Sequence, residues 1–329
     1  EVKAGYEKVI SSAEIPPSWR EYYQKQVKHH ENKIADAYTE SGIEMVDRDT
    51  EQHETLKEFE SLSDFRRFVL TKHLSLSEHG LYCACAGSAR DNLTIPTASG
   101  INGDFVPAME MVLNRLKSEF SLARRFHYEY LNEKVDEESL HESCYSELFN
   151  DELLGINIEK LRTAFRLCFG ILDKIAAAIC DLYQVQPSNG SIYFQGFWQL
   201  DQAGRREKFE KIKTPGLLAL YSLATDLNER KDGELAFFKQ WRNDLEHKFV
   251  VIHESVDPID IYDSFKSNDK IITIAESDFL EHLEQLLQIT RSAIFSFVFC
   301  VREKGLQEKK NDGIDGIYVQ NTIGRKDYL

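Results

Sequence analysis

Residues 233–250 read GELAFFKQWRNDLEHKFV, and this stretch decides both the fold and the candidate chemistry of the chain. Its large apolar residues recur at three- and four-residue steps, which predicts a helix with one apolar stripe formed by Phe238, Trp241, Leu245 and Phe249. At about 100° per residue, Asn243 and His247 fall one turn apart on the side opposite that stripe. The helix is therefore expected to bury one face and to present an amide and an imidazole on the other.

Arg242 lies at the edge of the apolar stripe, and Glu246 lies one turn beyond it. A guanidinium offers a fixed fork of donors to phosphate oxygens, and an imidazole gives or takes a proton near neutral pH. Arg242, Asn243 and His247 together therefore indicate phosphate chemistry. The alternative is that they are simply solvated, as charges on the polar side of an amphipathic helix usually are.

Three more segments have the spacing of helices, which predicts a mainly α fold. They are residues 158–183, residues 215–227 after Thr214 as N-cap, and residues 278–304 between an N-cap at Ser277 and a stop at Gly305. Asp173 lies within the apolar face of the first of these helices. A buried carboxylate needs a partner, because an unpaired buried charge is costly. Arg242 and Lys174 are the two candidates.

The spelling R-N-x-x-x-H resembles the signature of the HEPN superfamily. The dipeptide Asp173-Lys174 and the segments ALYSLATDL, RNDLEHKF and VREKG resemble one bacterial HEPN family that has an extra helical region at its N-terminus. The resemblance implies an up-and-down bundle and a metal-independent endoribonuclease without a cofactor. In that role Arg242, His247 and Asn243 would be catalytic, and Asp173 would brace Arg242.

The resemblance also implies a homodimer whose two motifs line one RNA cleft, and a role as a toxin or antiviral defence effector. An antitoxin or an upstream sensor module would then be a further partner. Such an enzyme would use the 2′-hydroxyl of RNA as nucleophile and leave 2′,3′-cyclic phosphate and 5′-hydroxyl ends. The alternative is a catalytically inactive HEPN-type module for dimerisation or nucleotide binding.

Composition, turn-forming residues and runs of charge suggest five segments along the chain. We expect an extended N-terminal arm (1–18), a helical N-terminal region (19–133), an acidic linker (134–152), the bundle (153–306) and a loose C-terminal tail (307–329). Two short β-branched runs, Phe249–Ile252 and Lys270–Ala275, could pair as a hairpin.

The formal net charge of −15 argues against a protein held on nucleic acid by its overall field, so an RNA site would be a local basic patch. The candidate patch is Arg205, Arg206, Lys208, Lys211 and Lys213, which is equally well explained as a solvated helix start. Four aromatic residues precede it, and they either stack bases or, more often, cover a core: Tyr193, Phe194, Phe197 and Trp198.

No apolar run approaches the roughly 20 residues of a membrane span, and no basic-then-apolar leader is present, which favours a cytoplasmic protein. Cys168, Cys180 and Cys300 fall in helical apolar patterns and are expected to be buried free thiols. His79, Cys83 and Cys85 resemble half of a zinc site, but no second ligand pair follows at a familiar spacing, so no metal is expected.

Overall fold

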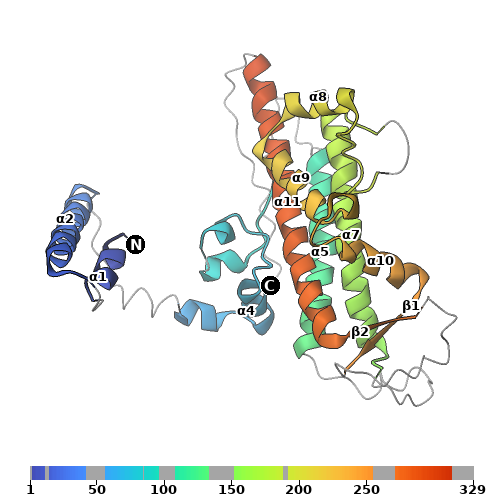
Figure 1. The fold of residues 1–329 in the computed structure, drawn as a ribbon, viewed down its shortest axis with the longest axis horizontal. Helices are drawn as coiled ribbons and strands as arrows, with labels where there is room; N and C mark the ends of the chain where they lie inside the picture. Colours follow the sequence, from blue (N-terminus) through green and yellow to red (C-terminus); the bar gives the residue numbers. More distant parts are fainter. Residues whose placement is uncertain are drawn as a thin grey trace. The chain divides into compact units, whose positions relative to one another are not determined.

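The computed structural model describes residues 2–11, 15–41, 56–83, 85–95, 108–132, 152–187, 192–254 and 271–312 (Figure 1). The chain divides into two compact units, Glu1–Ser61 and Leu62–Leu329. The predicted boundary at 134–152 therefore falls inside the second unit, and apart from Glu152 the predicted linker lies outside the described residues.

Among the described residues of the first unit, α1 (Val2–Ile10) and α2 (Pro17–Ser41) are helices. The predicted extended arm (1–18) is wrong for Val2–Ile10, half of its residues, which form the helix α1. Its Tyr6 ring packs on Tyr23 at 5.6 Å and on His30 at 5.7 Å between ring centroids. Such a short helix depends on packing against a neighbour, which its own sparse apolar residues do not reveal.

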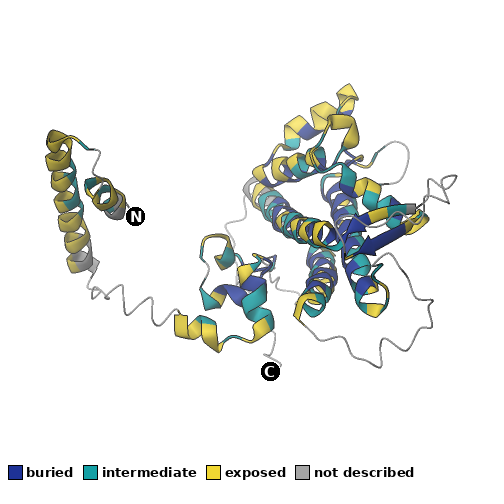
Figure 2. Cartoon of the chain, turned by 60° about the horizontal axis from the view of Figure 1, so that its bottom comes forward, coloured by how far each residue is buried: buried dark blue, intermediate teal, exposed yellow. Residues whose placement is uncertain are grey.

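The second unit is built on three long helices that lie side by side (Figure 1). These are α5 (Ala108–Asn132), α7 (Ile156–Tyr183) and α11 (Glu276–Asp312). The shorter helix α9 (Pro215–Asp226) packs on α11, and Thr214 accepts the N–H of Leu217 as its N-cap. Figure 2 shows buried residues concentrated where the long helices face one another. The mainly α bundle predicted from the sequence is confirmed, with α5 as one of its core helices.

Shorter elements surround the long helices. They are α4 (Asp64–Thr71), η1 (His79–Leu81), η2 (Ala86–Ala89), α8 (Ala203–Ile212), η3 (Glu229–Lys231) and α10 (Phe237–His247). Within the described residues, no helix is both long enough and apolar enough to cross a membrane.

The two strands, β1 (Phe249–His253) and β2 (Ile271–Ala275), pair in parallel, with Phe249 opposite Ile271 and His253 opposite Ala275. The predicted hairpin is therefore wrong in direction, although the two runs do pair. Parallel strands need a crossover of a dozen or more residues, and the connection 255–270, outside the described residues, is long enough to supply one.

The closing helix α11 also differs from its prediction. It begins at Glu276, directly after β2, and it continues through Gly305 to Asp312, so residues 307–312 of the predicted loose tail are helical. A glycine inside a helix costs only about 1 kcal/mol relative to alanine, and the residues after Gly305 are good helix formers.

The expected buried thiols Cys168, Cys180 and Cys300 are confirmed, and burial raises the pKa of the Cys168 thiol to about 12.

Candidate functional site

The helix α10 is held against the bundle by aromatic rings. Phe238 is fully buried and meets Phe165 of α7 edge-on, with 5.9 Å between ring centroids. Trp241 stacks on Phe279 of α11 at 5.8 Å with an interplanar angle of 3°. Phe238 and Trp241 of the predicted apolar stripe are confirmed as packing residues, and they fix which residues of α10 face α7. Phe249 is a correction, because α10 ends at His247 and Phe249 is the first residue of β1, where it is 68% exposed.

Arg242 lies on the side of α10 that faces α7, next to Asp173. Its Nη2 is 3.5 Å from Oδ2 of Asp173, and its side chain is 29% exposed. The guanidinium carbon lies 5.9 Å from the centre of the Phe169 ring and 6.0 Å from that of Tyr193. The group is thus positioned by one carboxylate and two aromatic rings, and the long contact to Asp173 leaves donors for a ligand.

Asp173 links α7, α10 and the segment before α8. Its Oδ1 accepts the backbone N–H of Phe194 at 2.9 Å, and its Oδ2 faces Arg242. Burial raises the pKa of this carboxyl above its ordinary value, against the opposing effects of the Phe194 N–H and of Arg242. Of the two candidate partners, Lys174 is engaged elsewhere, since its Nζ is 2.8 Å from Oε2 of Glu119.

Asn243 and His247 lie one turn apart on α10, and His247 is the last residue of that helix. Asn243 is partly buried and His247 is exposed, in keeping with their expected position opposite Phe238. Within the described residues, neither side chain has a hydrogen-bond partner. The imidazole of His247 is therefore open to solvent, the amide of Asn243 is partly so, and both lie on the helix whose Arg242 is positioned by Asp173.

A residue that the sequence reasoning missed is Asp244, which is only 2% exposed. Its Oδ1 accepts from Gln240 Nε2 at 2.8 Å and pairs with Lys248 Nζ at 3.0 Å. The four-residue spacing of Gln240, Asp244 and Lys248 was the available signal. These contacts run along the last two turns of α10 and hold the helix end that carries His247.

The segment before α8 contributes one exposed ring. Phe194, Phe197 and Trp198 are buried in the core, so for these three the core-covering interpretation is correct. Tyr193 is 49% exposed, and the centre of its ring lies 6.0 Å from the guanidinium carbon of Arg242.

The predicted basic patch needs one correction, because Arg205 does not point to solvent. It is 9% exposed, and its guanidinium donates to the carbonyls of Trp198, Val185, Gln186 and Phe197. An arginine whose donors are consumed by the backbone is not available to RNA. Arg206, Lys208, Lys211 and Lys213 are exposed, and Lys211 pairs with Glu207 at 2.8 Å.

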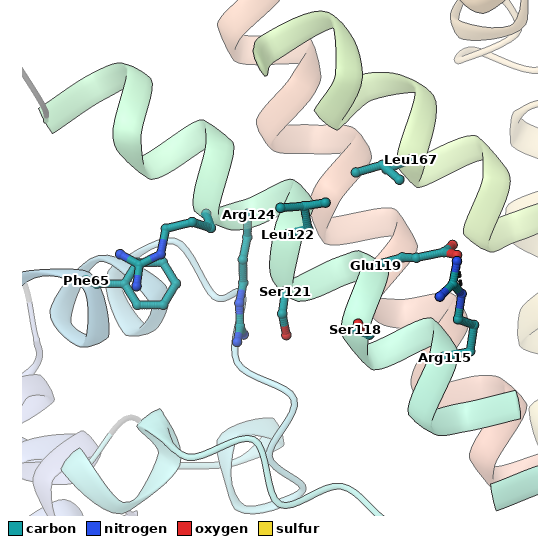
Figure 3. A pocket seen from close by; sticks show the side chains of 9 residues that line it. Phe65, Arg115, Ser118, Glu119, Ser121, Leu122, Arg124 and Leu167 are labelled. Atoms are coloured by element: carbon teal, nitrogen blue, oxygen red, sulfur yellow. Dashed lines mark hydrogen bonds and ion pairs between the residues drawn. The ribbon is translucent and has the colours of Figure 1, made fainter. Parts of the chain in front are cut away.

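A hollow of about 560 Å³ lies along α5, and Figure 3 shows its lining side chains. Arg115 and Glu119 stand at one end and Phe65 at the other (Figure 3). Arg125 also lines the hollow, with its guanidinium carbon 3.9 Å from the centre of the Phe65 ring. Leu167 lines this hollow from α7, whereas the neighbouring Arg166 faces Glu246 of α10 at 3.7 Å. Because successive residues of a helix point about 100° apart, the hollow and the motif lie on adjacent sides of α7.

The chain was compared with known proteins. The search of curated proteins found no match, and neither did the search of solved structures. A family model described as LA2681-like HEPN matches residues 102–304, a range that begins just before α5 and ends within α11. The matched range includes α5, α7 and the motif helix α10 in full and α11 as far as residue 304. The chain therefore belongs to the LA2681-like HEPN family.

Proposed function

We propose that this protein is a metal-independent endoribonuclease whose catalytic residues are Arg242, Asn243 and His247. Membership of a HEPN family supports a function connected with RNA or with defence. The single observation that carries the finer proposal is the state of Arg242: it is held by Asp173, Phe169 and Tyr193, yet among the described residues most of its N–H donors have no partner.

The mechanism uses the nucleophile that RNA already carries. His247 takes the proton of the 2′-hydroxyl, and the oxygen attacks the adjacent phosphorus. The P–O5′ bond breaks, which leaves a 2′,3′-cyclic phosphate on one fragment and a 5′-hydroxyl on the other. Arg242 neutralises the charge that develops on the phosphoryl oxygens.

Asp173 and Tyr193 support the catalytic residues without taking part in the reaction. Asp173 keeps Arg242 against α7, and the exposed ring of Tyr193 beside the guanidinium offers a surface on which a base can stack. Asn243, one turn before His247, orients the imidazole or donates to the phosphate.

The reaction also needs an acid for the leaving oxygen, and a single His247 in one chain supplies only the base. A symmetric homodimer with the two motif helices facing one cleft would supply a second imidazole. The outward-facing positions of Asn243 and His247, without partners in the described part of the chain, favour such a pairing. A toxin or antiviral defence role, in the cytoplasm and with an antitoxin or sensor as partner, is the corresponding biological expectation.

The decisive experiment incubates the wild-type chain and His247→Ala with mixed RNA in the presence of a chelator. Wild type should cleave and leave cyclic phosphate ends, and the variant should be slower by about 10²–10⁴-fold, the usual contribution of one acid–base group. His29→Ala, an exposed histidine of the first unit, is the matched control and should cleave like wild type.

Three results would contradict the proposal. Cleavage by His247→Ala at the wild-type rate would remove the imidazole from the mechanism. Absence of cleavage by a folded wild-type dimer on every RNA, together with nucleotide binding, would favour the inactive interaction module instead. Loss of cleavage only when magnesium is chelated would indicate a different chemistry.

A further inference from the structure

The segment between α4 and α5 brings three metal-binding side chains together, away from the motif. His79 belongs to η1, and Cys83 and Cys85 precede η2. One ligand atom of each lies within 4.8 Å of the others, and His79 Nε2 is 3.1 Å from Cys85 Sγ. Among the residues that the structure describes, this is the one group of three or more His, Cys, Asp or Glu side chains so arranged.

The separations suit a tetrahedral metal ion. Zinc binds sulfur at about 2.3 Å and imidazole nitrogen at about 2.0 Å, which sets the ligand atoms of a tetrahedral site roughly 3.5–3.8 Å apart. The group therefore needs only small side-chain adjustments to close on an ion. The sequence alone did not predict this, because the three residues lack a second ligand pair nearby.

Hydrogen bonds around the two cysteines favour charged sulfur. The backbone N–H of Cys85 donates to Cys83 Sγ at 3.4 Å, and Ser88 Oγ lies 3.9 Å from Cys85 Sγ. Ser88 Oγ donates its one proton to the carbonyl of Cys83 at 2.6 Å, which fixes the turn between the cysteines. The backbone N–H aimed at Cys83 Sγ stabilises a metal-bound thiolate and orients it.

The surrounding loop is held by the bundle. Arg291 of α11 donates to the carbonyl of Ser75 at 2.7 Å and to that of Gly80 at 3.4 Å. A Cβ at Gly80 would lie 2.9 Å from Ser75 Oγ, so the two strands of the loop touch where no side chain fits. Ligands carried by a fixed loop lose little freedom when they bind an ion.

Packing does not explain these two cysteines. Cys168, Cys180 and Cys300 are buried among apolar neighbours, whereas Cys83 and Cys85 are only partly buried and lie beside an exposed imidazole. A pair of accessible thiols next to a histidine is reactive, and coordination is the arrangement that satisfies all three groups at once.

We propose that His79 Nε2, Cys83 Sγ and Cys85 Sγ bind one Zn²⁺, with the fourth position open to water or to an exchangeable ligand. Imidazole and thiolate ligands suit zinc, whereas magnesium and calcium prefer oxygen. Two thiolates balance the charge of the ion. The site is independent of the proposed ribonuclease activity. A bound ion would cross-link residues of the loop between α4 and α5.

The test measures metal directly, on the full tag-free chain purified under reducing conditions. Elemental analysis should find one zinc per chain, and replacement by Co²⁺ should give a thiolate-to-cobalt charge-transfer band with tetrahedral d–d bands. His79→Ala, Cys83→Ser and Cys85→Ser should each weaken zinc binding by at least about 100-fold, since even outer-shell partners are worth 10–100-fold. His247→Ala should bind zinc like wild type, because its imidazole is not a ligand.

The wild-type cobalt spectrum keeps the test valid even if a cysteine variant fails to fold. A wild-type chain that holds no zinc and gives no charge-transfer band would overturn the proposal. So would full zinc binding by folded His79→Ala, Cys83→Ser and Cys85→Ser. Finding Cys83 joined to Cys85 as a disulfide in protein alkylated at the moment of cell lysis would instead identify a redox pair.

Discussion

Arg205 and Arg242 show how differently one side chain type is used in two regions of the same bundle. The guanidinium of Arg205 donates to four backbone carbonyls around the start of α8 and is almost fully buried. That of Arg242 on α10 has one long contact to Asp173, lies between two rings, and is 29% exposed. An arginine that donates four of its five N–H groups to the backbone is part of the fold, and one that is held in place with donors to spare can bind an anion.

Substituting lysine at both positions tests this comparison with a matched pair that keeps the charge. Arg205→Lys should lower the free energy of unfolding by about 3 kcal/mol, because one ammonium cannot serve all four carbonyls, three of whose bonds are buried, and each unsatisfied buried group costs about 1–3 kcal/mol. Arg242→Lys should change that free energy by less than about 1 kcal/mol and slow RNA cleavage by at least about 100-fold. Urea unfolding and single-turnover cleavage measure the two effects.

The contrast fails if the two variants behave alike. A stable Arg205→Lys chain would mean that water replaces the missing donors. An Arg242→Lys chain that cleaves at the wild-type rate would mean that a point charge suffices and that the planar fork has no part in the reaction.

Substitutions of Asp173, the carboxylate that faces Arg242, test the same comparison by changing the acceptor and not the arginine. Asp173→Asn keeps an oxygen for the N–H of Phe194 but removes the charge beside Arg242, so cleavage should fall by about 10–100-fold. The free energy of unfolding should hold or rise slightly, because burial raises the pKa of this carboxyl and its charged form is therefore disfavoured in the fold.

Asp173→Ala is the control, since it also leaves the Phe194 N–H without an acceptor and should cost about 1–3 kcal/mol of stability. Equal cleavage by wild type and Asp173→Asn would show that Phe169 and Tyr193 alone position Arg242.

The sequence predicted the parts whose physics is local. The apolar stripe of α10, the broad apolar face of α7 and the N-cap of α9 follow from spacing and capping, and a carboxylate at Asp173 demanded a cation. The pairing with Arg242 rather than Lys174 depended on where Glu119 of α5 lies, which spacing does not give.

What the sequence did not predict depends on distant backbone. A run of basic residues has the same sequence pattern whether its members are solvated or buried. Arg205 is buried because the carbonyls of Val185, Gln186, Phe197 and Trp198 surround its guanidinium. The parallel direction of β1 and β2 and the closing of His79 on Cys85 likewise come from the path of the chain.

His127 of α5 adds a third case to the comparison, a buried side chain with an unpaired polar atom. Its substitution is expected to have the smallest effect of those predicted. Its ring is 1% exposed and meets Phe68 edge-on at 5.6 Å, and its Nδ1 has no partner within the described residues. Burial lowers the pKa of His127 to about 4; Glu284 opposes this shift and Lys72 adds to it, and those two side chains pair with each other at 2.7 Å.

Because the unfolded ring takes up its proton near pH 6.5 and the folded ring only near pH 4, this group favours the fold fully above pH 6.5 and penalises it as the pH falls toward 4. The free energy of unfolding should therefore be about 2 kcal/mol lower at pH 5 than at pH 8 on account of His127 alone. His127→Phe should remove that part of the decline, and His29→Phe, at an exposed position, should retain it. An identical decline in His127→Phe and wild type, measured by urea unfolding at both pH values, would mean that the carboxylates alone set the acid sensitivity and that His127 accepts a proton inside the folded bundle.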